Sequence, residues 1–186
     1  MPKPMLVFED ISDANRHRLL TFAGVDVMAT PGAWMSPFCF CLLGMAVAFA
    51  GLADQTFVSV LLHGIIYGLM LSVCNTVHSL GHIFSGRLTG AAMDILLLTA
   101  TRDVNLYTSD QSHCSKWKFI GRSLGGPVFN MIFASIGYGL WKATGVAWLL
   151  MFSGFNLAIG LWTLFPIPSL DGWVIWGELF GFRRRS

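Results

Sequence analysis

Two histidines, His78 and His82, lie four residues apart in a long apolar stretch and are the side chains of this sequence best suited to chemistry. In an α-helix, residues i and i+4 lie on one face about one turn apart, so both imidazoles can reach a common point. Imidazole nitrogens are ordinary zinc ligands. The pair predicts a metal site, although a histidine in a membrane helix often only hydrogen-bonds to a neighbouring helix.

Ser79 occupies the position at which the H-E-x-x-H motif of zinc metalloproteases has its glutamate. In that motif the glutamate takes a proton from the water bound to zinc. A serine hydroxyl is not a base at neutral pH, so the sequence predicts a metal site that lacks the usual base. Of the remaining carboxylates, only Asp94 and Glu178 are expected near the site.

The composition is that of a membrane protein. The 186 residues are 54% hydrophobic and 12% charged, whereas a soluble domain has about a quarter charged residues. No signal peptide is expected, because residues 1–32 are mixed and polar. The four cysteines form no C-x-x-C pair and are expected to be buried thiols, with Cys74 as a less favoured extra metal ligand.

Apolar runs predict an all-α membrane protein, a polytopic bundle of about four transmembrane helices. After the second run, residues 89–101 are apolar but too short to span, and a re-entrant or interfacial segment fits them. Ile95–Thr99 and Asp103–Tyr107 are predicted to pair as a short β-hairpin. The four runs cover about residues 33–53, 57–84, 119–141 and 146–165, and a shorter apolar piece covers 172–182.

The basic residues predict the orientation, because cytoplasmic loops carry an excess of Lys and Arg. With a cytoplasmic N-terminus and four spans, all of them except Lys142 fall on the cytoplasmic side. The chain is therefore predicted to be a multi-pass protein of the inner (cytoplasmic) membrane, with both termini cytoplasmic. Residues 1–32 form a cytoplasmic segment, 33–182 a single membrane domain and 183–186 a basic tail.

Two further motifs contain polar residues near apolar segments. Gly125–Asn130, G-G-P-V-F-N, is either a kinked helix with an Asn that bonds across the bundle or a polar wall of a metal cavity. Asp171, in F-P-I-P-S-L-D-G, either caps the next helix or supplies an oxygen ligand to zinc. Three protein ligands plus water are the pattern of a catalytic zinc site.

Taken together, the three motifs resemble the site-2 protease family of intramembrane zinc metalloproteases. That family has H-E-x-G-H, G-P-x-x-N and L-D-G in this order, where this chain has H-S-L-G-H, G-P-V-F-N and L-D-G. The resemblance covers about residues 57–182. It implies that His78, His82 and Asp171 are the metal ligands and that Gly126, Pro127 and Asn130 line a substrate or partner cleft. It also implies a hairpin that can pair with an unwound substrate strand.

The substitution at Ser79 determines the expected activity. A general base contributes about 10²–10⁴-fold to a reaction rate, so the chain is expected to be a divergent, catalytically inactive homologue that binds zinc and a transmembrane partner in the lipid bilayer. Two alternatives remain: an active intramembrane zinc metalloprotease with an unusual base, and a structural subunit of a larger membrane complex. The sequence gives no support for binding to nucleic acid.

Overall fold

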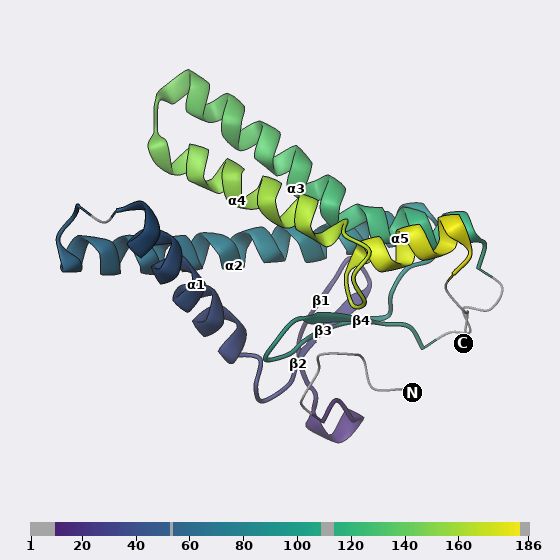
Figure 1. The fold of residues 1–186 in the computed structure, drawn as a ribbon. Helices are drawn as coiled ribbons and strands as arrows, with labels where there is room; N and C mark the ends of the chain where they lie inside the picture. Colours follow the sequence, from purple (N-terminus) through teal and green to yellow (C-terminus); the bar gives the residue numbers. More distant parts are fainter. Residues whose placement is uncertain (1–9, 53, 109–113, 183–186) are drawn as a thin grey trace.

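The computed structural model describes residues 10–52, 54–108 and 114–182. Within these residues the chain is mostly helical, with a small β-sheet packed at one end of the helices (Figure 1). The predicted basic tail at 183–186 and the middle of the polar loop before residue 116 lie outside the described residues.

Helix α2 (Phe57–Leu88) carries the histidine pair. Thr56 caps its first turn by accepting a hydrogen bond from Ser59 N, and the helix contains no proline. Within the described part of the chain it is the one helix long and apolar enough to cross a membrane, whereas α1 (Met35–Gly51) and α4 (Ala147–Thr163) are apolar but shorter. The predicted apolar helices are confirmed as helices, while the number of spans stays a prediction.

Helix α3 (Lys116–Thr144) packs between α2 and α4, and the short helix α5 (Asp171–Phe180) packs against α3. Helices α2 and α4 also touch each other, which brings the segment after α4 to the histidines. Glycines allow α2 and α3 to approach closely, since a Cβ on Gly81 would lie 2.3 Å from the Gly125 carbonyl oxygen. The glycines of the G-G-P motif thus serve close helix packing.

The sheet has four strands in the order β1-β2-β3-β4. The predicted hairpin is confirmed, because β3 pairs antiparallel with β4 and Leu98 lies opposite Asp103. The N-terminal hairpin, for which the sequence predicted no structure, joins the same sheet through parallel pairing of β2 with β3. The strands are β1 (His17–Phe22), β2 (Val25–Ala29), β3 (Ile95–Leu98) and β4 (Asp103–Leu106).

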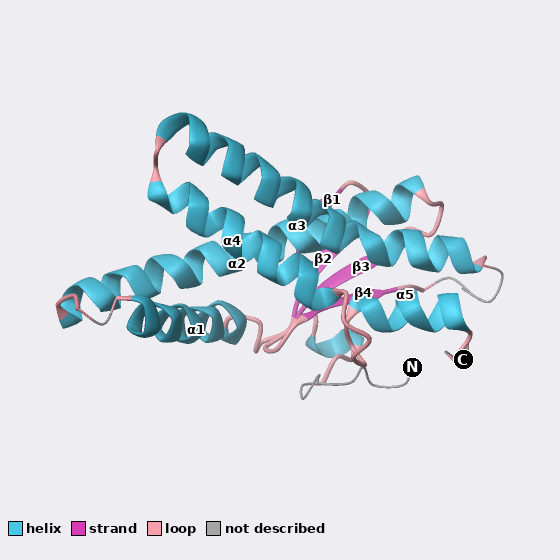
Figure 2. Ribbon diagram, turned by 45° about the horizontal axis from the view of Figure 1, so that its top comes forward, coloured by secondary structure: helices cyan, strands magenta, loops and turns pink. Residues whose placement is uncertain are grey.

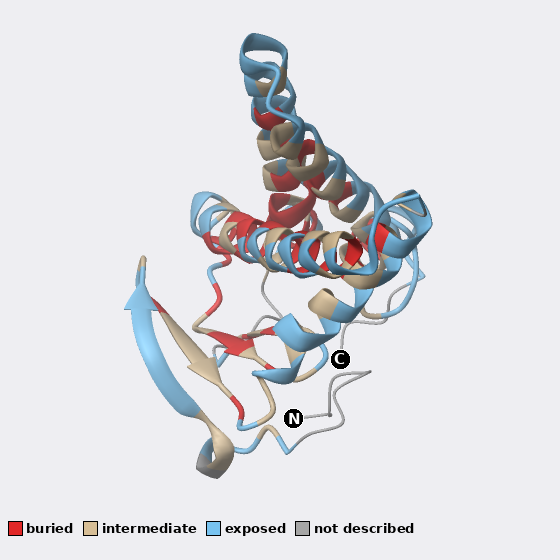
Figure 3. Ribbon diagram, turned by 90° about the vertical axis from the view of Figure 1, so that its left-hand side faces the viewer, coloured by how far each residue is buried: buried red, intermediate tan, exposed pale blue. Residues whose placement is uncertain are grey.

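The sheet is held against the histidine-bearing half of α2 by apolar packing. Val25, Met93 and Leu96 form one buried cluster with Ile83 of α2. Figures 2 and 3 show the sheet beside the helices at the end where α5 lies, with β1 as its exposed outer edge. The opposite edge strand, β4, begins with Asp103, which lies against α2.

Candidate metal centre

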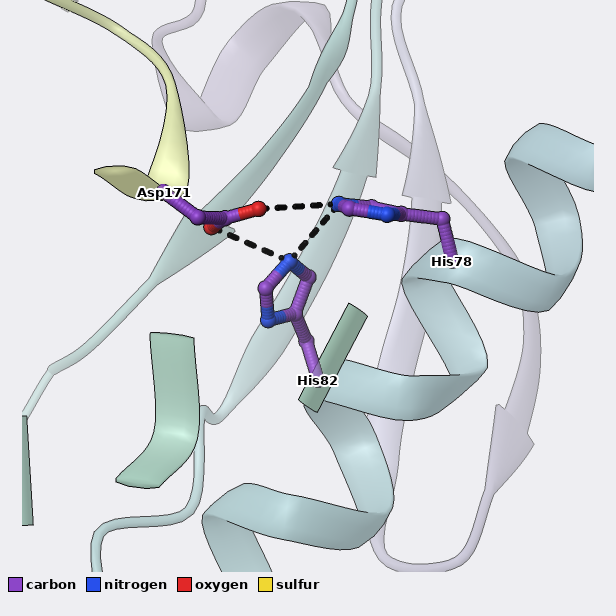
Figure 4. A group of neighbouring side chains, drawn as sticks. All are labelled: His78, His82 and Asp171. Carbon is purple, nitrogen blue, oxygen red and sulfur yellow. Dashed lines mark hydrogen bonds and ion pairs between the residues drawn. The ribbon is translucent and has the colours of Figure 1, made fainter. Parts of the chain in front are cut away.

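His78, His82 and Asp171 meet at one point, as the sequence predicted (Figure 4). His78 Nε2 lies 3.1 Å from His82 Nε2 and 3.0 Å from Asp171 Oδ2. His82 Nε2 lies 3.2 Å from Asp171 Oδ1. One ligand atom from each of the three residues therefore lies within 4.8 Å of the others. Their role as metal ligands is a prediction that this convergence supports.

The segment that follows α4 delivers Asp171 to the histidines. Leu164 ends the helix, and Ser169 has a positive φ of 83° that turns the chain back. A Cβ on Gly172 would lie 2.1 Å from Leu164 O, so only glycine permits this approach. Arg102, from the turn between β3 and β4, donates through Nη1 to Ser169 O at 2.9 Å. The hairpin thus steadies the segment that carries Asp171.

Asp171 is the first residue of α5 and does not act as its helix cap, which the sequence had left as an alternative. The N-cap of α5 is Leu170, without a side-chain cap bond. The Asp171 carboxylate instead interacts with the two imidazoles. Burial alone would raise the pKa of this carboxyl, but His82 and His78 overcome that effect and lower its pKa below the ordinary value. The carboxylate is therefore ionised at neutral pH.

The hydrogen bonds behind the imidazoles fix their tautomers. His82 Nδ1 lies 2.9 Å from the backbone carbonyl oxygen of Arg122, so Nδ1 carries a proton and donates it. His78 Nδ1 lies 2.7 Å from Asn130 Oδ1. Asn130 must present its oxygen there, because its Nδ2 donates to Cys74 O at 3.1 Å. In both neutral imidazoles Nε2 is then a bare acceptor aimed at the other ligands.

Three potential ligand atoms lie 3.0–3.2 Å from one another, so one cation placed between them could bind all three. A tetrahedral zinc ion with ligands at about 2.0–2.1 Å sets neighbouring ligand atoms about 3.3 Å apart. The observed separations are close to that value, and two imidazoles with one carboxylate are a ligand set that zinc accepts. The residues therefore fit a zinc ion with one coordination position left for water or substrate.

Gly126 keeps the space beside the imidazoles open. A Cβ at this position would lie 2.5 Å from His78 Nε2 and 2.6 Å from His82 Nε2. Pro127 and Asn130 are fully buried behind the histidines. The role of Gly126, Pro127 and Asn130 in lining a cleft stays a prediction, since the main pocket beside the site is lined by other residues.

This pocket has a volume of about 690 Å³ and opens beside the three predicted ligands. Its wall combines α2, the β4 strand, α3 and the segment before α5. Residues from all four meet there: Asn75, His78, Ser79, His82, Asp103, Arg122, Ser169 and Asp171. A pocket of this size is large enough for several residues of an extended polypeptide.

Asp103 is the carboxylate nearest to Ser79, which the sequence did not predict. Ser79 Oγ donates to Asp103 Oδ2 at 2.5 Å, and Asn75 Nδ2 donates to the same oxygen at 3.0 Å. Burial raises the pKa of Asp103, against the effect of these two hydrogen bonds. The expectation for Asp94 and Glu178 is wrong, since neither lines the pocket and Asp94 accepts from Thr108 N.

Asn156 of α4 is a second residue that the sequence analysis missed. It is fully buried, accepts from Asn130 Nδ2 at 2.8 Å and donates to Cys74 Sγ at 3.0 Å. Cys74 is therefore a buried partner of the asparagines, and it lies outside the group of three metal-ligand candidates. The signal available in the sequence was the position of Asn156 in a largely apolar segment, which predicts a buried polar contact.

Comparison with solved structures finds a similar fold in the Site-2 Protease from Methanocaldococcus jannaschii. The similarity has a TM-score of 0.62 at 16% sequence identity, and it covers 90% of this chain and 73% of that one. No protein-family model and no curated protein sequence matches the chain. The chain has a site-2 protease-like fold.

Proposed function

We propose that this chain is a membrane protein that binds zinc through His78, His82 and Asp171 and engages an unwound segment of a transmembrane polypeptide beside the metal. The observation that carries the proposal is the convergence of His78 Nε2, His82 Nε2 and the Asp171 carboxylate, with hydrogen bonds at each Nδ1 that leave Nε2 of the neutral imidazole as the metal-binding atom. A bound zinc ion would supply a Lewis acid that polarises a carbonyl group and lowers the pKa of water.

The membrane setting is supported by the surface of the helices. Helix α2 is apolar over a length that can cross a bilayer. Large apolar side chains on it are half exposed or more, among them Leu62, Leu69 and Val73. A lipid bilayer would shield this apolar surface from water, which is favourable. We place the chain in the cytoplasmic membrane as a multi-pass protein with both termini in the cytoplasm.

The polypeptide partner is suggested by the position of β4. This strand is an edge of the sheet and also borders the pocket. An edge strand presents backbone donors and acceptors that an extended segment can pair with. A transmembrane helix would have to unwind locally to do so, and the pocket beside the predicted ligands would receive the unwound part.

Zinc binding is tested by metal analysis of the purified full chain in mild detergent. We expect about one zinc per chain, and loss of it in His82→Ala. The matched control is His63→Ala, because His63 lies on the same helix and bonds to Ser59 O, outside the group of three. Zinc absent from the wild-type protein, or retained unchanged in His82→Ala, would refute the proposal.

Partner binding is tested separately by cross-linking in native membranes. A photoreactive amino acid at Asn105 of β4 lies in the pocket wall and should capture a membrane-spanning polypeptide. The control position is Leu19 of β1, the exposed edge on the far side of the sheet. Equal capture from both positions would contradict a partner site at β4.

Inactivity is expected from the sequence because Ser79 replaces the glutamate base and no other carboxylate is expected to take its position. Asp103 removes that premise, because its carboxylate is hydrogen-bonded to Ser79. This contact favours the second candidate, an active intramembrane zinc metalloprotease with an unusual base.

A further inference from the structure

The contact between Ser79 and Asp103 joins helix α2 to strand β4. In the sequence, these elements are separated by the loop after α2 and by strand β3. Ser79 is 4% exposed and donates to Asp103 Oδ2 at 2.5 Å. Asp103 is partly buried in the pocket wall, together with His78 and His82. A carboxylate is therefore held directly beside the residue that stands where the metalloprotease motif has its glutamate.

The length of this contact matches the reach of a glutamate side chain. Ser79 Oγ is the covalent counterpart of the Cγ atom of a glutamate, since each is bonded to Cβ. In a glutamate the carboxylate oxygens lie about 2.4 Å beyond Cγ, from ordinary C–C and C–O bond lengths. Asp103 Oδ2 lies 2.5 Å beyond Ser79 Oγ. Serine and aspartate together thus place a carboxylate at the distance that one glutamate would reach.

Asp103 is also fixed in orientation. Ser79 and Asn75, one helical turn apart on α2, both donate to Oδ2. Its backbone pairs with Leu98 in the sheet, which packs on α2. Both of these side-chain hydrogen bonds go to Oδ2 and leave Oδ1 out. A carboxylate held in this way needs little rearrangement to act.

We propose that Asp103 is the general base of this site and that the chain is a peptide hydrolase. The inference rests on the zinc site proposed above. Asp103 accepts a proton from the attacking water, whose oxygen bonds to the peptide carbonyl carbon. It then returns the proton to the peptide nitrogen as the C–N bond breaks. The products are a carboxylic acid and an amine, and water is the co-reactant.

The environment of Asp103 suits this role. Burial raises the pKa of its carboxyl above the ordinary value, which makes the carboxylate a stronger proton acceptor. The structural alternative is that Asp103 only anchors β4 to α2 through Ser79. The two roles differ in one respect: a base bonds to a ligand at the metal, whereas an anchor does not.

Acetohydroxamic acid is a probe of this difference that needs no substrate. A hydroxamate binds zinc through its oxygens and gives its proton to a carboxylate close by. Loss of a charged hydrogen bond weakens binding about 10-fold or more. We therefore expect Asp103→Asn to retain zinc and to bind acetohydroxamate at least about 10-fold more weakly than wild type by calorimetry. The matched control, Asp94→Asn, changes a hairpin carboxylate outside the pocket and should bind like wild type.

Equal acetohydroxamate affinity in wild type and Asp103→Asn would overturn the assignment of the base. So would a zinc-loaded wild-type protein that binds no acetohydroxamate. Either result, with zinc still bound, leaves the proposed zinc site in place. Wild-type protein that holds no zinc would instead refute the proposed function itself, and the base with it.

A second variant relocates the carboxylate and addresses the case in which Asp103→Asn does not fold. In Ser79→Glu combined with Asp103→Ser, the helix carries the glutamate and the strand the hydroxyl. We expect this double variant to bind acetohydroxamate like wild type, and Ser79→Glu alone to bind it more weakly, because two carboxylates then crowd one place. Double and single variants with the same affinity would contradict the proposal.

Peptide hydrolysis is then measured with a fluorescence-quenched apolar peptide in detergent micelles. Wild type should cleave it, and Asp103→Asn should be slower by about 10²–10⁴-fold, the usual contribution of a general base. Cleavage at the same rate in both would overturn the proposal. Cleavage by the double variant but not by wild type would also overturn the proposal, because Asp103 on the strand would then not act as a base.

Discussion

At the scale of single residues, the site depends on what stands behind the predicted ligands. Asn130 orients His78, and the carbonyl of Arg122 orients His82. Such partners fix the tautomer of each imidazole and raise its basicity toward a metal. Asn130 of the G-P-V-F-N motif thus holds the predicted ligand His78 in place.

Asn130→Ala is expected to lower zinc affinity about 10–100-fold, because His78 loses the acceptor that fixes its tautomer. Zinc affinity is measured by competition with a chromogenic chelator. Ser135→Ala, an exposed position on the same helix that bonds only to Met131 O, is the control and should leave the affinity unchanged. An Asn130→Ala protein with wild-type affinity would mean that this hydrogen bond does not matter to the site.

Gly126→Ala is expected to abolish stoichiometric zinc binding, since its Cβ would lie within 2.6 Å of both Nε2 atoms. Alanine is more favourable than glycine in a helix by roughly 1 kcal/mol, so the substitution should not destabilise the helix itself. Gly139→Ala, on the same helix with nothing within 4 Å of the added Cβ, is the matched control. Full zinc content in Gly126→Ala would show that the ligands do not meet beside this glycine.

At the scale of elements, the sequence predicted the apolar helices and the β3–β4 hairpin because each rests on a local pattern. The spacing of His78 and His82 likewise follows from the helix alone. The position of Asp103 could not be predicted in this way, since it depends on how the sheet packs on α2 through residues such as Ile83 and Leu96. The N-terminal hairpin was missed for the same reason: its pairing with β3 is a long-range contact.

Leu97 of β3 is fully buried between strands, next to Val104. Leu97→Ala is expected to lower the free energy of unfolding by about 2–5 kcal/mol, as for other buried leucines. Denaturation in detergent, followed by circular dichroism, measures the change. Leu19→Ala on the exposed β1 edge should cost less than about 1 kcal/mol. A similar loss of unfolding free energy in both variants would contradict the claim that the sheet is a packed unit.

At the scale of the whole molecule, five segments far apart in the sequence converge on one end of the helical assembly. α2 brings the histidines, β4 brings Asp103 and the segment before α5 brings Asp171, while α3 and α4 supply the buried asparagines. A site assembled from so many elements exists only in the folded chain, so a zinc ion bound there would stabilise the fold.

Zinc retention is expected to fall as the pH drops below about 6, because protons compete with zinc for the imidazole nitrogens. Asp171 does not contribute in this range, since its lowered pKa keeps it ionised. Chelator competition from pH 8 to pH 5 measures the effect. Affinity that stays constant over this range would argue against imidazole ligands.

X-ray absorption at the zinc edge of the purified full chain tests the central claim most directly. The account predicts a zinc ion with two imidazole ligands and only nitrogen or oxygen neighbours at about 2.0–2.2 Å. A sulfur neighbour at about 2.3 Å, or a zinc ion without imidazole scattering, would contradict a centre built from His78, His82 and Asp171.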